Sequence, residues 1–68
     1  MKLSARNQLK GTITSVEKGP ISAKVKIDVG GGNTITSMVT AETADDLDLK
    51  AGDPVLAIIK ASEVLIGK

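Results

Sequence analysis

Alternation of apolar and polar residues is the clearest pattern in this chain, and it predicts β-strands. Between residues 21 and 29 an apolar side chain stands at every second position, with Ser, Lys and Asp in between. This is the period of a half-buried strand. Residues 8–17 and 34–40 alternate less regularly but are rich in Thr, Ile and Val. Turn residues separate the three segments at Gly19-Pro20 and at 30–33. The first 40 residues therefore predict a three-stranded meander.

The period changes after this meander. Ala41, Ala44 and Leu47 recur at three-residue spacing, which places them on one face of a helix. Thr40 or Thr43 has a side-chain oxygen suited to accept from the first free backbone N–H groups of that helix. We expect one short helix here.

Two further apolar stretches follow, at residues 55–59 and 64–66, and both predict strands. The order is then three strands, a helix, a fourth strand and a short fifth strand. This order is typical of the OB-fold, a small Greek-key barrel. The sequence thus predicts an all-β, five-stranded OB-like barrel with one short helix between strands 3 and 4, formed by a single domain over residues 1–68.

Size and composition favour a homo-oligomer. The chain has 68 residues and contains no Cys, His, Phe, Tyr or Trp, although 41% of its residues are hydrophobic. Domains below about 70–80 residues usually need additional stabilisation, such as disulfides, a metal or association with a partner. Residues 55–59 are apolar without interruption, so that strand needs cover on both faces. A barrel of this size covers one face, and a second subunit would cover the other.

The absent residues also exclude functions. Without His or Cys the chain has no side-chain type that ordinarily titrates between about pH 5 and 8, and no ligands for a zinc site. We therefore expect a binding protein and not an enzyme. The N-terminus lacks the apolar stretch of a signal peptide, and no run of residues is long enough to span a bilayer. These features predict a cytoplasmic protein that does not bind membranes.

Two short segments carry the candidate chemistry. Ser4-Ala5-Arg6-Asn7 lies near the start and Lys60-Ala61-Ser62 near the end, and each joins a cation to a hydroxyl group beside a predicted strand. Cations, hydroxyls and backbone N–H groups together are the donors that a small oxyanion requires. The same residue types are also common on ordinary solvated surfaces, and residue types alone leave both readings open.

The chain closely resembles the molbindins, single-domain Mop proteins, over essentially its whole length. The resemblance is carried by Ser4-Ala5-Arg6-Asn7-Gln8-Leu9-Lys10-Gly11, by Gly32-Asn33-Thr34-Ile35-Thr36-Ser37 and by Ile59-Lys60-Ala61-Ser62. It implies an OB-like barrel that assembles as a hexamer and holds molybdate or tungstate between subunits, with no other cofactor. The anion contacts that it implies are Ser4, Ala5, Arg6, Asn7, Lys60, Ala61 and Ser62.

The resemblance also implies a second class of oxyanion site, near a symmetry axis. The segment Lys18-Gly19-Pro20-Ile21-Ser22 is the candidate by position, with Gly19, Ile21 and Ser22 as the contacts. An ordinary turn is the alternative interpretation of these residues.

The resulting functional hypothesis is reversible binding of molybdate or tungstate at subunit interfaces, for intracellular storage or buffering of molybdenum. One alternative is an OB module that binds nucleic acid. It is disfavoured because such modules stack bases on aromatic side chains, and this chain offers only a strip of lysines at 10, 24 and 26. A purely structural oligomerisation domain is the other alternative, and it would not need the cation and hydroxyl pairs at the two ends.

Overall fold

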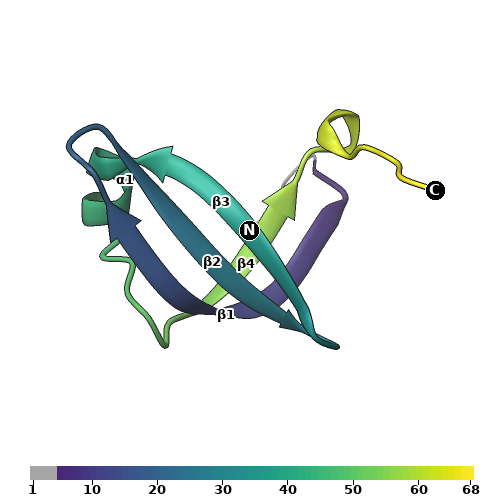
Figure 1. Ribbon diagram of the computed structural model, residues 1–68, viewed down its shortest axis with the longest axis horizontal. Helices are drawn as coiled ribbons and strands as arrows, with labels where there is room; N and C mark the ends of the chain where they lie inside the picture. Colours follow the sequence, from purple (N-terminus) through teal and green to yellow (C-terminus); the bar gives the residue numbers. More distant parts are fainter. Residues whose placement is uncertain (1–4) are drawn as a thin grey trace.

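Four strands form one antiparallel sheet with the order β3-β2-β1-β4 in the computed structural model, which describes residues 5–68 (Figure 1). The elements follow the chain as β1 (Asn7–Lys18), β2 (Ser22–Gly30), β3 (Asn33–Thr40), α1 (Ala41–Asp46), β4 (Pro54–Ile59) and a single 3₁₀ turn, η1 (Ala61–Glu63). The predicted meander, the short helix and the fourth strand are therefore confirmed. Among the described residues no helix has the length and apolar character needed to cross a membrane.

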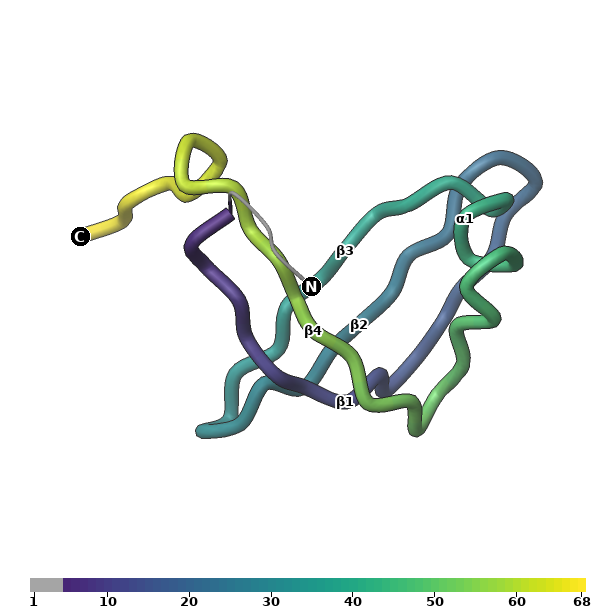
Figure 2. Tube along the Cα trace, turned by 180° about the vertical axis from the view of Figure 1, so that it is seen from behind, coloured from purple at the N-terminus to yellow at the C-terminus, as the bar shows by residue number. Residues whose placement is uncertain are grey.

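β1 is long because it pairs with two different strands along its length. Its first half, residues 7–12, pairs with β4, and its second half pairs with β2. The register of the second pairing shifts between Ile13 and Ser15. Such a bulge bends a strand and increases its twist, which allows β1 to pass from one partner to the other. The sheet is strongly curved as a result (Figure 2).

The core lies on the concave side of this curved sheet. In β2 the buried residues are Ala23, Val25 and Ile27, which matches the predicted alternation within the strand, whereas Ile21 precedes β2 and is 80% exposed. Val25 and Ile27 form a small core with Ile13 of β1 and Ala57 of β4, and half-buried Val, Ile and Leu residues pack around it. The loop before β4 is attached to the bulge, since the N–H of Ile13 donates to the carbonyl of Asp53 over 2.9 Å.

α1 begins where the sequence predicts. The Thr40 hydroxyl accepts a hydrogen bond from the N–H of Thr43 over 3.0 Å and so caps the helix. Ala44 is the buried residue of the helix. Asp45 forms an ion pair with Lys18 at the end of β1, which joins the helix to the β1–β2 turn.

The predicted fifth strand and the closed barrel are not confirmed in the single chain. Residues 64–66 belong to no strand, and the described sheet ends at β3 on one side and at β4 on the other. The physical reason is the η1 turn, in which the N–H of Glu63 donates to the carbonyl of Lys60 over 2.8 Å. The segment after this turn runs away from the sheet (Figures 1 and 2), so its apolar residues have no strand beside them.

Gly11 lies where β1 and β2 approach each other closely. A Cβ atom at this position would lie 2.6 Å from the carbonyl oxygen of Asp28 and 2.6 Å from Cγ2 of Ile27. Because one of these atoms belongs to the backbone, the strands themselves would have to move apart. We predict that Gly11→Ala lowers the free energy of unfolding by about 1–3 kcal/mol, the usual cost of overpacking, measured by urea denaturation.

Gly19→Ala is the matched control for this substitution. A Cβ atom there would meet only the carbonyl oxygen of Ser22, at an ordinary contact distance of 3.4 Å. We expect this variant to remain within about 0.5 kcal/mol of the parent protein. Equal stabilities of the two variants would contradict the close approach at Gly11.

Candidate oxyanion-binding site

The two ends of the chain that carry the candidate donors lie side by side. Antiparallel pairing places Asn7, the first residue of β1, opposite Ile59, the last residue of β4. The residues just outside this pair therefore meet, and they line a cleft of about 370 Å³. Its lining consists of Ala5, Arg6, Lys60, Ala61 and Ser62. Ser4, which the sequence also placed in the site, lies outside the described residues.

Hydrogen bonds from β1 fix the edge of this cleft. The side-chain amide of Asn7 donates to the carbonyl of Ile59 over 3.2 Å. The side-chain amide of Gln8 donates to the carbonyl of Ala5 over 3.0 Å. Asn7 was predicted as an anion contact, and in the single chain its amide connects the two strand ends that carry Arg6 and Lys60.

The η1 turn supplies backbone donors to the same cleft. The first residues of a helical turn have N–H groups without partners inside the turn. Within residues 5–68, the N–H groups of Ala61 and Ser62 donate to no backbone carbonyl. The small side chain of Ala61 leaves room for an anion to approach them. The Ser62 hydroxyl lies in the same turn.

The two cations of the cleft form no ion pair with an acid among the described residues. Among the described residues, ion pairs involve only Lys18, Lys24 and Lys50 on the basic side. Arg6 and Lys60 form none of them, and both are exposed. Arg6 offers a planar fork of five N–H donors and Lys60 offers a compact ammonium group. Two such cations side by side favour an anion in the cleft.

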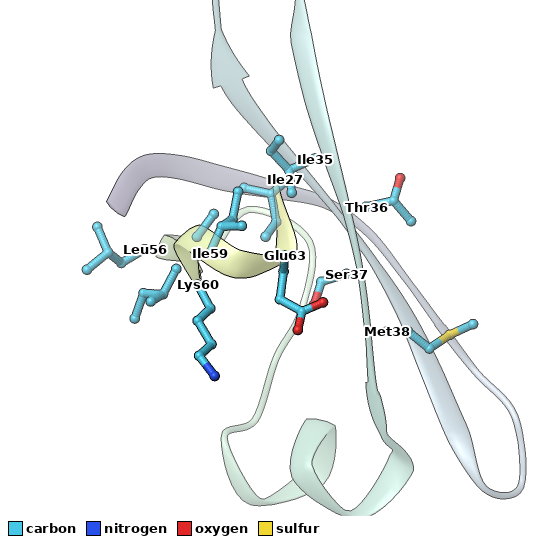
Figure 3. A pocket seen from close by; sticks show the side chains of 11 residues that line it. Ile27, Ile35, Thr36, Ser37, Met38, Leu56, Ile59, Lys60 and Glu63 are labelled. Atoms are coloured by element: carbon cyan, nitrogen blue, oxygen red, sulfur yellow. The ribbon is translucent and has the colours of Figure 1, made fainter. Parts of the chain in front are cut away.

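Lys60 also lines a second and larger groove, of about 670 Å³, which the sequence did not reveal. Figure 3 shows Lys60 and Glu63 extending from η1 at its mouth, with Ser37 of β3 across from Glu63 and Ile27 and Ile35 further inside. Neither Ser37 nor Glu63 is among the site residues predicted from the sequence. The groove could have been predicted from the uninterrupted apolar run of β4, which indicated that one side of this strand lacks a neighbour within the chain.

The second predicted oxyanion site is separate from this cleft. Gly19 and Ile21 lie in the turn after β1, at the opposite end of that strand, and Ser22 is the first residue of β2 (Figure 1). The N–H of Gly19 donates to the carbonyl of Ser22 over 2.8 Å, and the carbonyl of Ile21 accepts from the N–H of Ala41. The first bond closes the turn itself, and the second holds the turn against the start of α1.

Comparison with known proteins identifies the class to which this fold and site belong. The family model described as TOBE domain matches residues 3–66, and the chain belongs to this family. A probable molybdenum-pterin-binding protein of Haemophilus influenzae is 49% identical over 98% of this chain and 97% of its own length. The predicted relationship to the Mop proteins is thereby confirmed.

Solved structures agree with this assignment. A molybdate-binding protein from Sporomusa ovata superposes with a TM-score of 0.93 at 38% identity and covers all of both chains. The cytoplasmic molybdate-binding protein ModG, in a form with molybdate bound, has a TM-score of 0.85 at 46% identity over 90% of this chain and 43% of its own. The mostly β architecture with one short helix is common to this group.

The hydrogen bond from Asn7 gives a prediction about the cleft. Asn7→Ala removes the donor that connects β1 to the end of β4, and we expect it to lower the free energy of unfolding by about 0.5–1.5 kcal/mol, the usual net value of such a bond. Lys10→Ala is the control, since Lys10 is exposed in the same strand and makes no ion pair among the described residues. Urea denaturation checks both; an unchanged Asn7→Ala variant would show that the bond does not hold the strand ends.

Proposed function

We propose that this protein reversibly binds molybdate or tungstate in the cleft lined by Arg6, Lys60 and the η1 turn, between copies of the same chain. The observation that carries the proposal is the pair of cations, Arg6 and Lys60, that the β1–β4 pairing brings into one cleft and that form no ion pair within residues 5–68. The relatives' names supply the anion: a probable molybdenum-pterin-binding protein and molybdate-binding proteins of known structure.

The donor set suits a tetrahedral dianion. The Arg6 guanidinium and the Lys60 ammonium would neutralise its two charges, while the Ser62 hydroxyl and the free N–H groups of η1 would donate to the remaining oxygens. Nothing in this set ligates the metal atom, so the anion would be bound and released intact. Tungstate has the same charge and acceptor geometry as molybdate. Sulfate is smaller, so discrimination against it would come from the size of the completed site.

A single copy offers too few donors for tight binding. Hydrogen bonds to charged groups contribute about 1.5–3 kcal/mol each. Three side-chain donors would give a gross value of roughly 4.5–9 kcal/mol, whereas a micromolar ligand needs about 8 kcal/mol after the costs of binding are met. Arg6, Lys60 and Ser62 are also exposed in the single chain, where solvent weakens such bonds. A second copy placed over the cleft would enclose the anion and add donors, which is why we place the site between subunits.

The biological role that fits these properties is storage or buffering of molybdenum in the cytoplasm, by a homo-oligomer that we propose to be a hexamer on the basis of the family resemblance. Binding without turnover agrees with the relatives, which are named as binding proteins. The turn at Gly19, Ile21 and Ser22 is proposed as a separate, second oxyanion site. The number of anions bound per chain tests that assignment.

The nucleic-acid alternative gains no support from the arrangement of the lysines. Lys24, in the middle of the candidate basic strip, lies 3.8 Å from the carboxylate of Glu17. This pairing interrupts the strip, and no aromatic residue is present on which a base could stack.

Calorimetric titration of the anion-free protein with molybdate, tungstate and sulfate tests the proposal. We expect binding of the first two anions and little binding of sulfate. Lys60→Ala and Arg6→Ala should each weaken molybdate binding by roughly 10- to 150-fold, since each removes one charge-assisted hydrogen bond.

Lys26→Ala is the matched control for these variants, because Lys26 is an exposed lysine of β2 that does not line the cleft. It should bind molybdate like the parent protein. Absence of binding heat with both molybdate and tungstate would refute the proposal, and equal losses in all three variants would refute the location of the site.

The donor set also predicts how binding depends on pH. Without His or Cys, no side-chain type of this chain ordinarily changes its charge between about pH 6 and 8, and molybdate remains a dianion over the same range. We expect the dissociation constant to change less than about threefold between these limits. Titrations at pH 6, 7 and 8 in buffers of equal ionic strength would check this, and a change of tenfold or more would contradict the donor set.

A further inference from the structure

Lys60 stands at the boundary between the anion cleft and the large groove. It lines both of them, whereas Glu63 lines the groove and, within residues 5–68, does not line the cleft. The Lys60 side chain is a flexible four-carbon arm that ends in an ammonium group. It is exposed, and no ion pair among the described residues holds it. Two placements are therefore open to the ammonium, one towards Arg6 in the cleft and one over the groove.

Glu63 is the acid that the η1 turn places beside Lys60. The N–H of Glu63 donates to the carbonyl of Lys60 over 2.8 Å and so closes the turn. In a 3₁₀ turn, side chains three residues apart lie one above the other. Figure 3 shows both side chains extending from η1 on the same side, at the mouth of the groove. Because both are long and exposed, rotation about the side-chain bonds can bring the two charges into contact.

The cleft side of Lys60 offers no comparable partner among the described residues. Its neighbours there are Ala5, Arg6, Ala61 and Ser62, and Arg6 carries the same charge as Lys60. Like charges repel, so without a bound anion the ammonium is less favourably placed beside the guanidinium than beside the carboxylate. An anion in the cleft would reverse this preference, because it would attract both cations.

The pairing with Glu63 is weak enough for an anion to displace it. Exposed ion pairs shift an equilibrium by no more than about fivefold. Loss of the Lys60 ammonium from the cleft should cost roughly 10- to 150-fold in molybdate binding. The anion would therefore take Lys60 from Glu63, at the cost of a small part of its affinity.

We propose that Glu63 competes with the anion for Lys60. In the anion-free protein the Glu63 carboxylate pairs with the ammonium, and it must release the ammonium before the cleft binds an oxyanion. Glu63 is thus a positioning residue that acts through Lys60 and does not touch the anion. This inference rests on the proposed binding of molybdate or tungstate in the cleft, and it adds the residue that sets the affinity of that site.

The competition acts equally on all tetrahedral dianions. The pair that has to separate is the same whether molybdate, tungstate or sulfate enters the cleft. Glu63 therefore lowers the affinity for each of them by the same factor and leaves the selectivity to the size of the site. When the anion leaves, the carboxylate takes the ammonium back, which favours release. Such a device suits a protein that has to give up its anion as well as bind it.

A double-mutant cycle of Glu63 and Lys60 tests the competition. Molybdate is titrated by calorimetry into the parent protein, Glu63→Gln, Lys60→Ala and the double variant. Glu63→Gln removes the competing charge and keeps the shape of the side chain, so it should bind molybdate about two- to fivefold more tightly than the parent. In the Lys60→Ala background the same substitution should have no effect, because no ammonium remains to compete for.

Glu42→Gln is the matched control for this cycle. Glu42 is an exposed acid in the first turn of α1, and in the described part of the chain it forms no ion pair and lines neither the cleft nor the groove. The substitution changes the net charge by the same amount and should leave molybdate binding as in the parent. An equal gain in Glu42→Gln and Glu63→Gln would overturn the proposal, because net charge alone would then explain it.

Three further outcomes would also overturn the proposal. Unchanged affinity in Glu63→Gln, beside normal binding by the parent, would show that Glu63 does not hold Lys60 and would leave the proposed function intact. A gain that persists in the Lys60→Ala background would show that the carboxylate repels the anion directly. Absence of molybdate binding by the parent would refute the proposed function and this inference together.

The dependence on salt gives a second readout. Charges exposed to solvent are screened as the ionic strength rises. The ratio of the affinities of Glu63→Gln and the parent should therefore fall towards one between about 0.05 and 0.5 M sodium chloride. A ratio that does not change with salt would contradict an ion pair between these two exposed groups.

Discussion

The antiparallel pairing of the first half of β1 with β4 is the constraint on which the rest of this structure depends. It joins two segments separated by most of the chain and places Asn7 opposite Ile59. The bulge between Ile13 and Ser15 allows the same strand to continue into the meander with β2. The cleft, the curvature of the sheet and the open edge of β4 all follow from this division of β1 between two partners.

The spacing of apolar residues predicted the strands and the helix of this fold better than it predicted how these elements pack and pair. The alternation in β2 and the helical spacing of Ala41 and Ala44 report local burial, so both elements were found from the sequence. The bulge in β1 was not, because Thr and Ser around Ile13 fit either face of a strand. Locating the site required the register of the strand pairing. Residue types indicated Arg6 and Lys60 as candidates, but only the pairing of β1 with β4 shows that they meet.

The predicted fifth strand shows what residue types alone cannot predict. Val64, Leu65 and Ile66 have the residue types of a strand, but a strand exists only beside another strand, and the η1 turn carries this segment away from both free edges of its own chain. The prediction of an oligomer came from a related observation, the apolar run of β4. The largest side chain among the fully buried residues is that of Ile13, so the single chain has a small core, as expected for a domain of this length without aromatic residues.

The absence of any linker between the turn proposed to bind the anion and the C-terminal segment has a thermodynamic consequence. Lys60, Ala61 and Ser62 are followed within two residues by Val64, so the donors cannot be positioned independently of that segment. If association of the chains raises the affinity for the anion by some factor, the anion must strengthen association by the same factor. The anion would then act as a ligand that regulates assembly, and the concentration of the protein would set its apparent affinity.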